Sequence, residues 1–176
     1  VDHPYFDNPD WINGIDEDCI CGITCPWGEN MLTCWFDPFL ADLNWKNPEV
    51  VEQLTDDAMF WLEHFDLDGL RLDAIPMMPR LATRQLRKKI DDTWDQKFNH
   101  TYLLGETYTG SAGHGQIRHY LGKYGLSGQF EFPTMWTLRS ALRGHESMQA
   151  LHAQVLRSAR AWDGSGSVMA PILGNH

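Results

Sequence analysis

Strand-like and helix-like segments alternate through most of this sequence, and the alternation limits the possible folds more than any other feature. Short apolar runs with the length of strands occupy 70–74, 102–106, 128–132 and 168–173. Segments with apolar residues at helical spacing occupy 48–65, 80–95, 134–143 and 147–162. Connections of this length suit parallel crossovers, so the order predicts an α/β fold with helices outside a parallel sheet.

The helix that begins near position 48 has the clearest start signal. Asn47 can cap it, and Pro48 suits its first position. Apolar residues then recur at helical spacing from Val50 as far as Trp61, Leu62 and Phe65, which predicts one apolar face.

Polar residues stand where three of the four predicted strands end. Asp73 and Glu106 end the first two strands, and the pair Asn175 and His176 follows the last. Periodicity alone allows either a doubly wound sheet or a (β/α)8 barrel. In a barrel the strand ends converge on one catalytic face, whereas in an open sheet they are spread along an edge. A barrel is therefore the more economical interpretation of residues 46–176.

Residues 1–45 contain many turn formers and no sustained period, which predicts an irregular excursion. Its cysteines lie close together in the sequence: Cys19, Cys21, Cys25 and Cys34. Two disulfides would staple such a segment and would indicate an exported protein, extracellular or periplasmic. A four-thiolate zinc site fits the spacing poorly, and free buried thiols are the remaining alternative. We expect the two disulfides.

The composition argues against two classes of partner. The formal net charge of −10 disfavours a polyanion such as nucleic acid. No apolar run reaches the roughly 18 residues of a membrane-spanning helix, so we expect no membrane partner. We also expect no organic cofactor. The sequence begins at Val1 without a signal-type segment, as expected of a processed, excised or incomplete chain.

Two carboxylates at neighbouring strand ends could cleave a glycosidic bond, which needs an acid for the leaving oxygen and a nucleophile or activated water. Arg71 precedes Asp73 by two residues on the same strand face and would keep that carboxylate ionised. Glu106 has no basic neighbour in its own apolar strand, which would keep it protonated as the acid. Gly105 would leave room for a sugar ring. From the residues alone, an ordinary ion pair, aldolase-like chemistry and metal-dependent barrel chemistry remain open.

Four motifs carry a resemblance that covers nearly the whole chain: 40–44 (LADLN), 69–74 (GLRLDA), 104–107 (LGET) and 173–176 (LGNH). In this order and spacing they resemble the domain B, strand-four, strand-five and strand-seven motifs of the α-amylase family of retaining glycoside hydrolases, family 13. The resemblance implies about half of a (β/α)8 TIM barrel of the α-amylase type. Residues 1–45 would then be the C-terminal part of a domain B-like excursion, and 46–176 the partial barrel.

The resemblance also implies a function. Asp73 would be the nucleophile, Arg71 would orient it, and Glu106 would be the general acid/base. The expected reaction is retaining hydrolysis of α-1,4-glucosidic bonds in a starch-like α-glucan, through a covalent glycosyl-enzyme intermediate. The alternatives are a glucan transferase of the same family and a truncated or non-catalytic homologue that at most binds carbohydrate.

Further residues match binding positions of that family. Asn175 and His176 match sugar-binding positions, and Tyr108, just past Glu106, is placed to stack on a sugar ring. Asp42 matches a calcium-ligand position, and Met77 stands where the family offers a backbone carbonyl to Ca2+.

Some parts of the family pattern are missing from the sequence. The third catalytic Asp should follow His176, and strands one to three and eight have no counterpart. Four strands leave open edges and an uncovered core. We therefore expect a piece of a longer enzyme, whose partner is the remainder of its own barrel.

Overall fold

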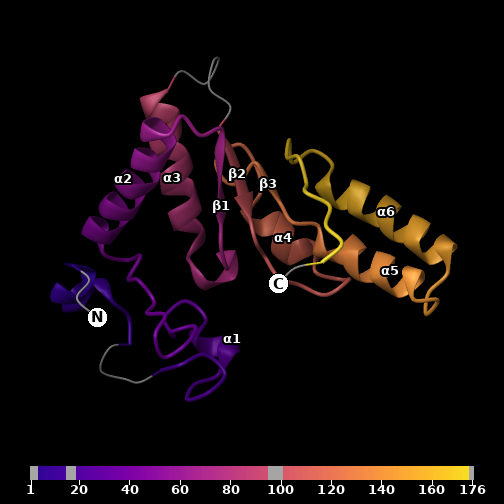
Figure 1. The fold of residues 1–176 in the computed structure, drawn as a ribbon, viewed down its shortest axis with the longest axis horizontal. Coiled ribbons are helices and arrows are strands. Elements are labelled where there is room, and N and C mark those ends of the chain that lie inside the picture. Colours follow the sequence, from indigo (N-terminus) through magenta and orange to yellow (C-terminus); the bar gives the residue numbers. More distant parts are fainter. Residues whose placement is uncertain (1–3, 15–18, 95–100, 175–176) are drawn as a thin grey trace.

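The computed structural model describes residues 4–14, 19–94 and 101–174, and three parallel strands form a sheet at its centre (Figure 1). The strands lie side by side in sequence order: β1 (Gly69–Leu72), β2 (Tyr102–Gly105) and β3 (Gly128–Gln129). A helix lies in each crossover between them, so the strands run the same way and finish at one edge of the sheet. The predicted parallel α/β sheet is confirmed.

The described helices divide into longer and shorter ones. The longer ones are α2 (Pro48–His64), α3 (Arg80–Thr93), α4 (His114–Tyr120), α5 (Phe132–Leu142) and α6 (Met148–Trp162). The shorter ones are η1 (Pro4–Asp7), η2 (Pro9–Trp11), α1 (Trp27–Asn30) and η3 (Ile75–Met77). Helices α2 and α3 pack together on the β1 side, whereas α5 and α6 pack together on the β3 side (Figure 1). None of the described helices is long and apolar enough to cross a bilayer.

Helix α2 begins where the sequence predicts, and only part of its predicted apolar face is buried. The side chain of Asn47 accepts a hydrogen bond from the backbone N–H of Glu49 at 2.9 Å, as a capping residue does. Trp61 and Phe65, however, are each 52% exposed, so the fold covers only part of the predicted apolar face. Their rings stack on each other at 5.0 Å, because helical spacing also brings them together on the outer side of α2.

One apolar core joins the sheet to the helices around it. It comprises Met59, Leu62, Ile75, Leu86, Ile90, Leu103, Ile117, Leu121 and Leu126. These side chains come from α2, α3 and α4, from β2, and from the turns at the strand ends. Removing each from water is worth about 1.5–3 kcal/mol, so this core fixes the positions of the strand ends.

Strand β3 is shorter than the predicted strand 128–132. It ends at Gln129, and Phe132 already begins α5. The side chain of Glu131 accepts a hydrogen bond from the backbone N–H of Thr134 at 2.9 Å and caps that helix. The last residues of the predicted strand therefore form the cap and the first turn of α5 instead.

The segment 168–173 lies where the fourth strand was predicted, but it does not form one. The backbone N–H groups of Val168 and Ala170 donate to the carbonyls of Ser127 and Gln129, both at 2.9 Å. A single parallel bridge joins Phe130 to Ala170. The segment therefore runs parallel to β3, as predicted. It forms only an isolated bridge, however, so the prediction of a regular strand here is wrong.

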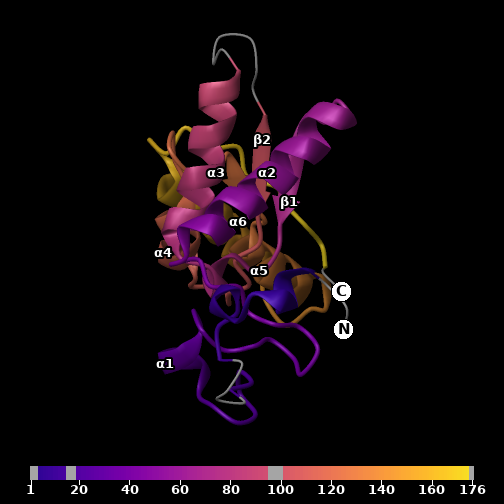
Figure 2. The ribbon, with the colours of Figure 1, turned by 90° about the vertical axis from the view of Figure 1, so that its left-hand side faces the viewer.

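The excursion before α2 is tied together by two disulfides, Cys19–Cys25 and Cys21–Cys34, with Cα–Cα distances of 5.4 and 5.3 Å. The disulfide prediction is confirmed, and the connectivity, which the sequence left open, is now assigned. Figures 1 and 2 both place the excursion beyond the edge where the strands finish. The division into two domains at residues 45 and 46 stays a prediction.

Candidate active site

Asp73 and Glu106 lie next to each other at the finishing edge of the sheet. They directly follow β1 and β2, in which Leu72 is paired with Gly105. The backbone N–H of Glu106 donates to the carbonyl of Leu72 at 3.0 Å, so the parallel ladder continues to the point where the carboxylates begin. The fold therefore brings together two predicted site residues from different parts of the sequence.

Arg71 connects these two carboxylates. Its Nη1 forms an ion pair with Oδ1 of Asp73, and its Nη2 donates to Oε2 of Glu106 at 2.6 Å. The guanidinium carbon also lies 6.0 Å from the centre of the Phe130 ring. The expected ion pair between Arg71 and Asp73 is confirmed, and one cation holds both acids in a single cluster.

The electrostatic difference predicted between the two carboxylates does not hold. Sequence reasoning placed a cation beside Asp73 alone, whereas Arg71 also pairs with Glu106, because parallel register brings the two strand ends together. What distinguishes the carboxylates is exposure. The side chain of Asp73 is 69% exposed, and that of Glu106 is 11% exposed. Asp73 is therefore the carboxylate more open to an approaching molecule.

Gly105 does not leave room for a sugar ring, contrary to the expectation. A Cβ at this position would lie 2.3 Å from Cδ1 of Leu126 and 3.0 Å from Cγ1 of Ile75. The space beside Gly105 is thus filled by the apolar core. Glycine is needed here because core side chains approach the backbone closely, and this packing holds the strand just before Glu106.

Tyr108 lies in the loop after β2, two residues beyond Glu106, and is 64% exposed. Its ring meets Phe132 edge-on at 5.2 Å and Trp136 at 6.0 Å. Nε1 of Trp136 donates to the carbonyl of Thr109 at 2.6 Å, which fixes the loop against α5. Sequence reasoning missed Trp136, because the contact between this loop and α5 exists only in the folded chain.

A further carboxylate stands near the end of β3, but it has a structural role. Glu131 is buried at 5% exposure, caps α5, and accepts a hydrogen bond from Oγ of Ser158 at 2.7 Å. Ser158 also lies 3.1 Å from Nε2 of His114 and from Oγ1 of Thr134. This polar network joins α4, α5 and α6.

The residues predicted to bind calcium do not form a complete site among the described residues. Asp42 Oδ2 accepts a hydrogen bond from Nδ2 of Asn13 at 2.7 Å. Burial raises the pKa of Asp42 to about 6, and the Asn13 hydrogen bond opposes that rise. No group of three His, Cys, Asp or Glu side chains that could hold a metal occurs in the described part of the chain. Because Ca2+ takes six to eight oxygen ligands, Asp42 and the carbonyl of Met77 do not suffice.

The predicted sugar-binding residues Asn175 and His176 lie outside the described residues.

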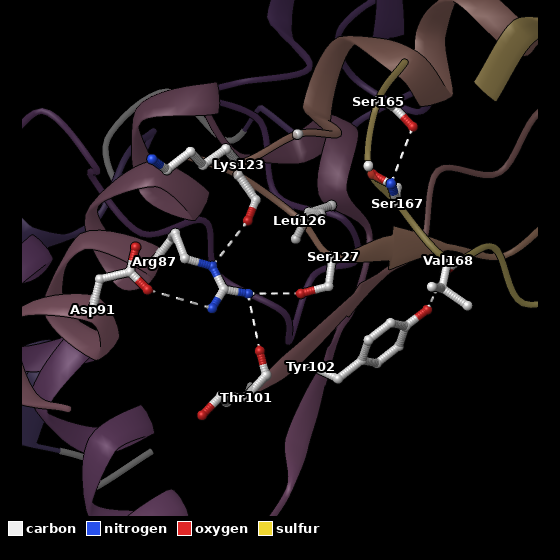
Figure 3. A pocket seen from close by; sticks show the side chains of 13 residues that line it. Arg87, Asp91, Thr101, Tyr102, Lys123, Leu126, Ser127, Ser165, Ser167 and Val168 are labelled. Atoms are coloured by element: carbon white, nitrogen blue, oxygen red, sulfur yellow. Dashed lines mark hydrogen bonds and ion pairs between the residues drawn. The ribbon is translucent and has the colours of Figure 1, made fainter. Parts of the chain in front are cut away.

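A pocket of about 520 Å³ lies at the opposite edge of the sheet, where the strands begin (Figure 3). Arg87 of α3 points into it and donates to the carbonyls of Thr101 at 3.0 Å and Gly125 at 3.3 Å. It also donates to Oγ of Ser127 at 2.7 Å and pairs with Asp91 at 3.8 Å. Burial lowers the pKa of Arg87, and Asp91 opposes that shift. This guanidinium is committed to holding the starts of neighbouring strands together.

Comparison with known proteins places this arrangement among carbohydrate-active enzymes. The family model "Alpha amylase, catalytic domain" matches residues 27–156. The intracellular maltogenic amylase of Bacillus subtilis (strain 168) is 34% identical over 73 residues, which are 40% of this chain and 12% of that protein. The cyclomaltodextrin glucanotransferase of Geobacillus stearothermophilus is 26% identical over 125 residues, which are 70% of this chain and 17% of that protein.

The fold is also similar to that of solved structures. The crystal structure of an α-amylase from Geobacillus thermoleovorans, complexed with acarbose, matches with a TM-score of 0.77 at 24% identity. The match covers 100% of this chain and 38% of that one. The predicted fold, part of a (β/α)8 barrel of the α-amylase type, is confirmed. The chain spans less than two fifths of the solved structure and less than a fifth of each relative.

Proposed function

Because this chain belongs to the α-amylase catalytic-domain family, we propose that the protein containing it hydrolyses α-1,4-glucosidic bonds of starch-like glucans with retention of configuration. The relatives support a glycoside hydrolase as the parent protein. The observation that carries the finer proposal is the cluster of Arg71, Asp73 and Glu106, in which two carboxylates on neighbouring strands share one guanidinium.

The reaction follows from the roles that the motif match gives to the two carboxylates. The carboxylate of Asp73 attacks the anomeric carbon, and Glu106 gives its proton to the departing glycosidic oxygen. The carbon–oxygen bond breaks, and an ester forms between the sugar and Asp73. A water molecule then gives a proton to Glu106 and attacks the same carbon, which releases the sugar and frees Asp73. The exposure of Asp73 supports its role as the attacking group.

Arg71 acts as a positioning residue in this scheme. Its two ion pairs hold the carboxylates in fixed relative positions before substrate arrives. Such pre-organisation lowers the barrier, because the reacting groups need not be ordered during the reaction. The ion pair also holds Oδ1 of Asp73 against Arg71, so the carboxylate group has a defined orientation when substrate approaches.

Three aromatic or polar side chains complete the proposed contacts with the glucan. Tyr108 offers an exposed ring near Glu106, and the edge contacts with α5 hold that ring in place. Asn175 and His176 would hydrogen-bond sugar hydroxyls, as the motif match implies. The acarbose-bound α-amylase fold, of which this chain matches 38%, supports a carbohydrate as the ligand class.

The activity is proposed for the complete protein. The described sheet has three strands, and the solved structure extends well beyond the matched part. The rest of the same protein would supply the other strands and the third catalytic carboxylate. The aromatic side chains on the outer side of α2, Trp61 and Phe65, are suited to be covered by that remainder, because each is half exposed here.

Calcium remains a proposal for the complete protein. Asp42 would supply one carboxylate, and Met77 would offer its backbone carbonyl. The remaining oxygen ligands would come from outside the described residues. If calcium binds the folded protein only, removing it with EDTA should lower the melting temperature, and adding Ca2+ should restore it. Unchanged melting in both buffers would argue against the site.

The proposed location is outside the cytoplasm, extracellular or periplasmic. Two disulfides in one short segment suit an oxidising compartment. The Bacillus subtilis relative is named as intracellular, so family membership alone does not decide the location. Detection of the disulfides in protein taken directly from its source, with thiols blocked during lysis, would support export.

Substitution of the two carboxylates tests the proposed reaction. In the complete protein, Asp73→Asn and Glu106→Gln should each lower kcat on soluble starch by about 10⁴-fold, because each removes a reacting group. Glu63→Gln, which changes an exposed carboxylate on α2, should leave kcat unchanged. Proton NMR of the first product should show retention. Starch turnover that survives Asp73→Asn, or activity confined to a β-linked glucan, would refute the proposal.

Glucan transfer is the second candidate, because the chain is similar over 125 residues to a cyclomaltodextrin glucanotransferase. In transfer, a sugar hydroxyl replaces water in the second step. Product analysis with maltoheptaose separates the two: hydrolysis gives only shorter chains, whereas transfer also gives longer or cyclic ones. Binding of maltoheptaose without any turnover would instead favour a non-catalytic homologue.

A further inference from the structure

Ala74, directly after Asp73, has a backbone conformation that L-amino acids rarely adopt. Its φ of 40° and ψ of 47° are those of the left-handed helical region. Among the described residues, only Ala74 and Asp66 combine a positive φ with a side chain. In this region the Cβ crowds the backbone, and glycine is the residue that avoids the cost. A conformation of this kind persists only where the surrounding structure imposes it.

Hydrogen bonds to the backbone of Glu106 impose it here. The carbonyl of Leu72 accepts from the N–H of Glu106 at 3.0 Å, and the N–H of Ile75 donates to the carbonyl of Glu106 at 2.9 Å. Asp73 and Ala74 form the two-residue turn between these bonds. One catalytic candidate is thus held by the backbone of the other.

The segment after the turn is equally fixed. Ile75 is fully buried in the core at 0% exposure and begins η3. Within this turn of helix, the N–H of Met77 donates to the carbonyl of Ala74 at 2.9 Å. The chain therefore leaves a strand at Leu72 and enters the core at Ile75, with the left-handed residue Ala74 between the two.

We propose that Ala74 is a positioning residue for Asp73. Its left-handed conformation turns the chain so that the Asp73 carboxylate points outward beside Arg71 while the backbone stays bonded to Glu106. The Cβ of Ala74 limits the φ and ψ angles that this turn can adopt. Glycine at the same position would allow a wider range of these angles. The inference rests on the proposed function, in which Asp73 is the nucleophile.

Ala74→Gly in the complete protein tests this role, with maltoheptaose as the substrate. Glycine adopts a left-handed conformation without crowding, so the melting temperature should stay within about 3 °C of the wild-type value. The turn becomes less restricted, so kcat should fall by about tenfold. KM should change by less than about twofold, because groups that hold the rest of the glucan are untouched.

Asp66→Gly is the matched control. Asp66 has the same kind of backbone conformation, with φ of 51°, but it lies in the turn before β1, at the other edge of the sheet. The same change there should leave kcat and KM unaltered. A merely structural role for the left-handed residues would make the two variants behave alike.

The outcomes separate the inference from the proposed function. A wild-type protein without turnover of maltoheptaose would refute both. An active wild type whose Ala74→Gly variant keeps its kcat within twofold would refute the positioning role alone. So would an equal loss of kcat in Asp66→Gly. A loss of kcat confined to Ala74→Gly, at unchanged melting temperature and KM, is the expected result.

Discussion

Two arginines lie at opposite edges of the same sheet, and each connects neighbouring strands in a different way. Arg71, at the edge where strands finish, pairs with two side-chain carboxylates and is itself 36% exposed. Arg87 reaches the edge where strands begin, is 11% exposed, and donates mainly to backbone carbonyls and to Ser127. The same type of side chain thus lies in a solvent-exposed cluster at one edge and in a largely buried cluster at the other.

The difference lies in the acceptors. The acceptors within hydrogen-bond distance of Arg87 are two backbone carbonyls and the Ser127 hydroxyl, and carbonyls do not change protonation state, so these bonds hold the fold together. The carboxylate that Arg87 faces, Asp91 at 3.8 Å, lies one turn along the same helix and is only 20% exposed. Carboxylates can exchange protons and form bonds, and the exposed one at Asp73 can meet a substrate. Parallel sheets of barrel type commonly place chemistry where strands finish and stability where they begin. The two arginines follow this division.

The largest expected effect tests the open edge. Arg71→Met in the complete protein should lower kcat on maltoheptaose by about 10³-fold, because Asp73 and Glu106 lose the group that fixes them. Arg71→Lys should lower it less, since lysine keeps the charge but cannot bridge two carboxylates in the same plane. Steady-state kinetics of both variants measures this. A Met variant with near wild-type kcat would show that Arg71 is only structural.

A smaller effect, on stability alone, is expected at the closed edge. Arg87→Met should lower the free energy of unfolding by about 3 kcal/mol, because buried carbonyls and Asp91 lose their donor. Arg84→Met, on the exposed side of the same helix, should cost less than about 0.5 kcal/mol. Chemical denaturation measures both. The kcat of folded Arg87→Met should stay within twofold of wild type. A large fall in kcat would contradict the assignment of catalysis to one edge and stability to the other.

Local signals explain why much of the fold could be predicted. The cap at Asn47, with Pro48 in the first turn, marks the start of α2 to the residue. Period-two alternation around Asp73, with a turn before it, marks β1. The close spacing of the cysteines favoured disulfides. Each of these signals depends on neighbouring residues, which the sequence displays directly.

The parts that could not be predicted depend on distant contacts. Arg71 and Glu106 are 35 positions apart, and only the register of β1 and β2 shows that they meet. Arg87 reads as a surface residue of an amphipathic helix, although it bonds to Ser127, 40 positions away. The exposure of Trp61 also depends on distant contacts. Helical spacing identifies an apolar face, but it does not show how much of that face the rest of the fold covers.

The smallest expected effect separates the pH dependence of stability from that of catalysis. His114 begins α4 and lies near Glu131 and Arg157. Burial lowers the pKa of His114; Glu131 opposes the shift and Arg157 adds to it. The folded protein therefore keeps His114 neutral at pH values where the unfolded chain protonates it. This contribution to stability is present above the ordinary histidine pKa of about 6.5 and is lost as pH falls below it.

Wild type should therefore lose unfolding free energy between about pH 7 and pH 5, by less than about 1 kcal/mol, because His114 is only partly buried. His114→Gln, which can still hydrogen-bond to Ser158, should show less of this loss. His119→Gln, an exposed histidine on the same helix, should behave as wild type. Denaturation at a series of pH values gives the comparison. The pH dependence of kcat should be the same in all three proteins, because neither histidine belongs to the carboxylate cluster around Arg71. A shifted pH profile of kcat in His114→Gln would show that the polar network of His114, Ser158 and Glu131 is coupled to the carboxylate cluster.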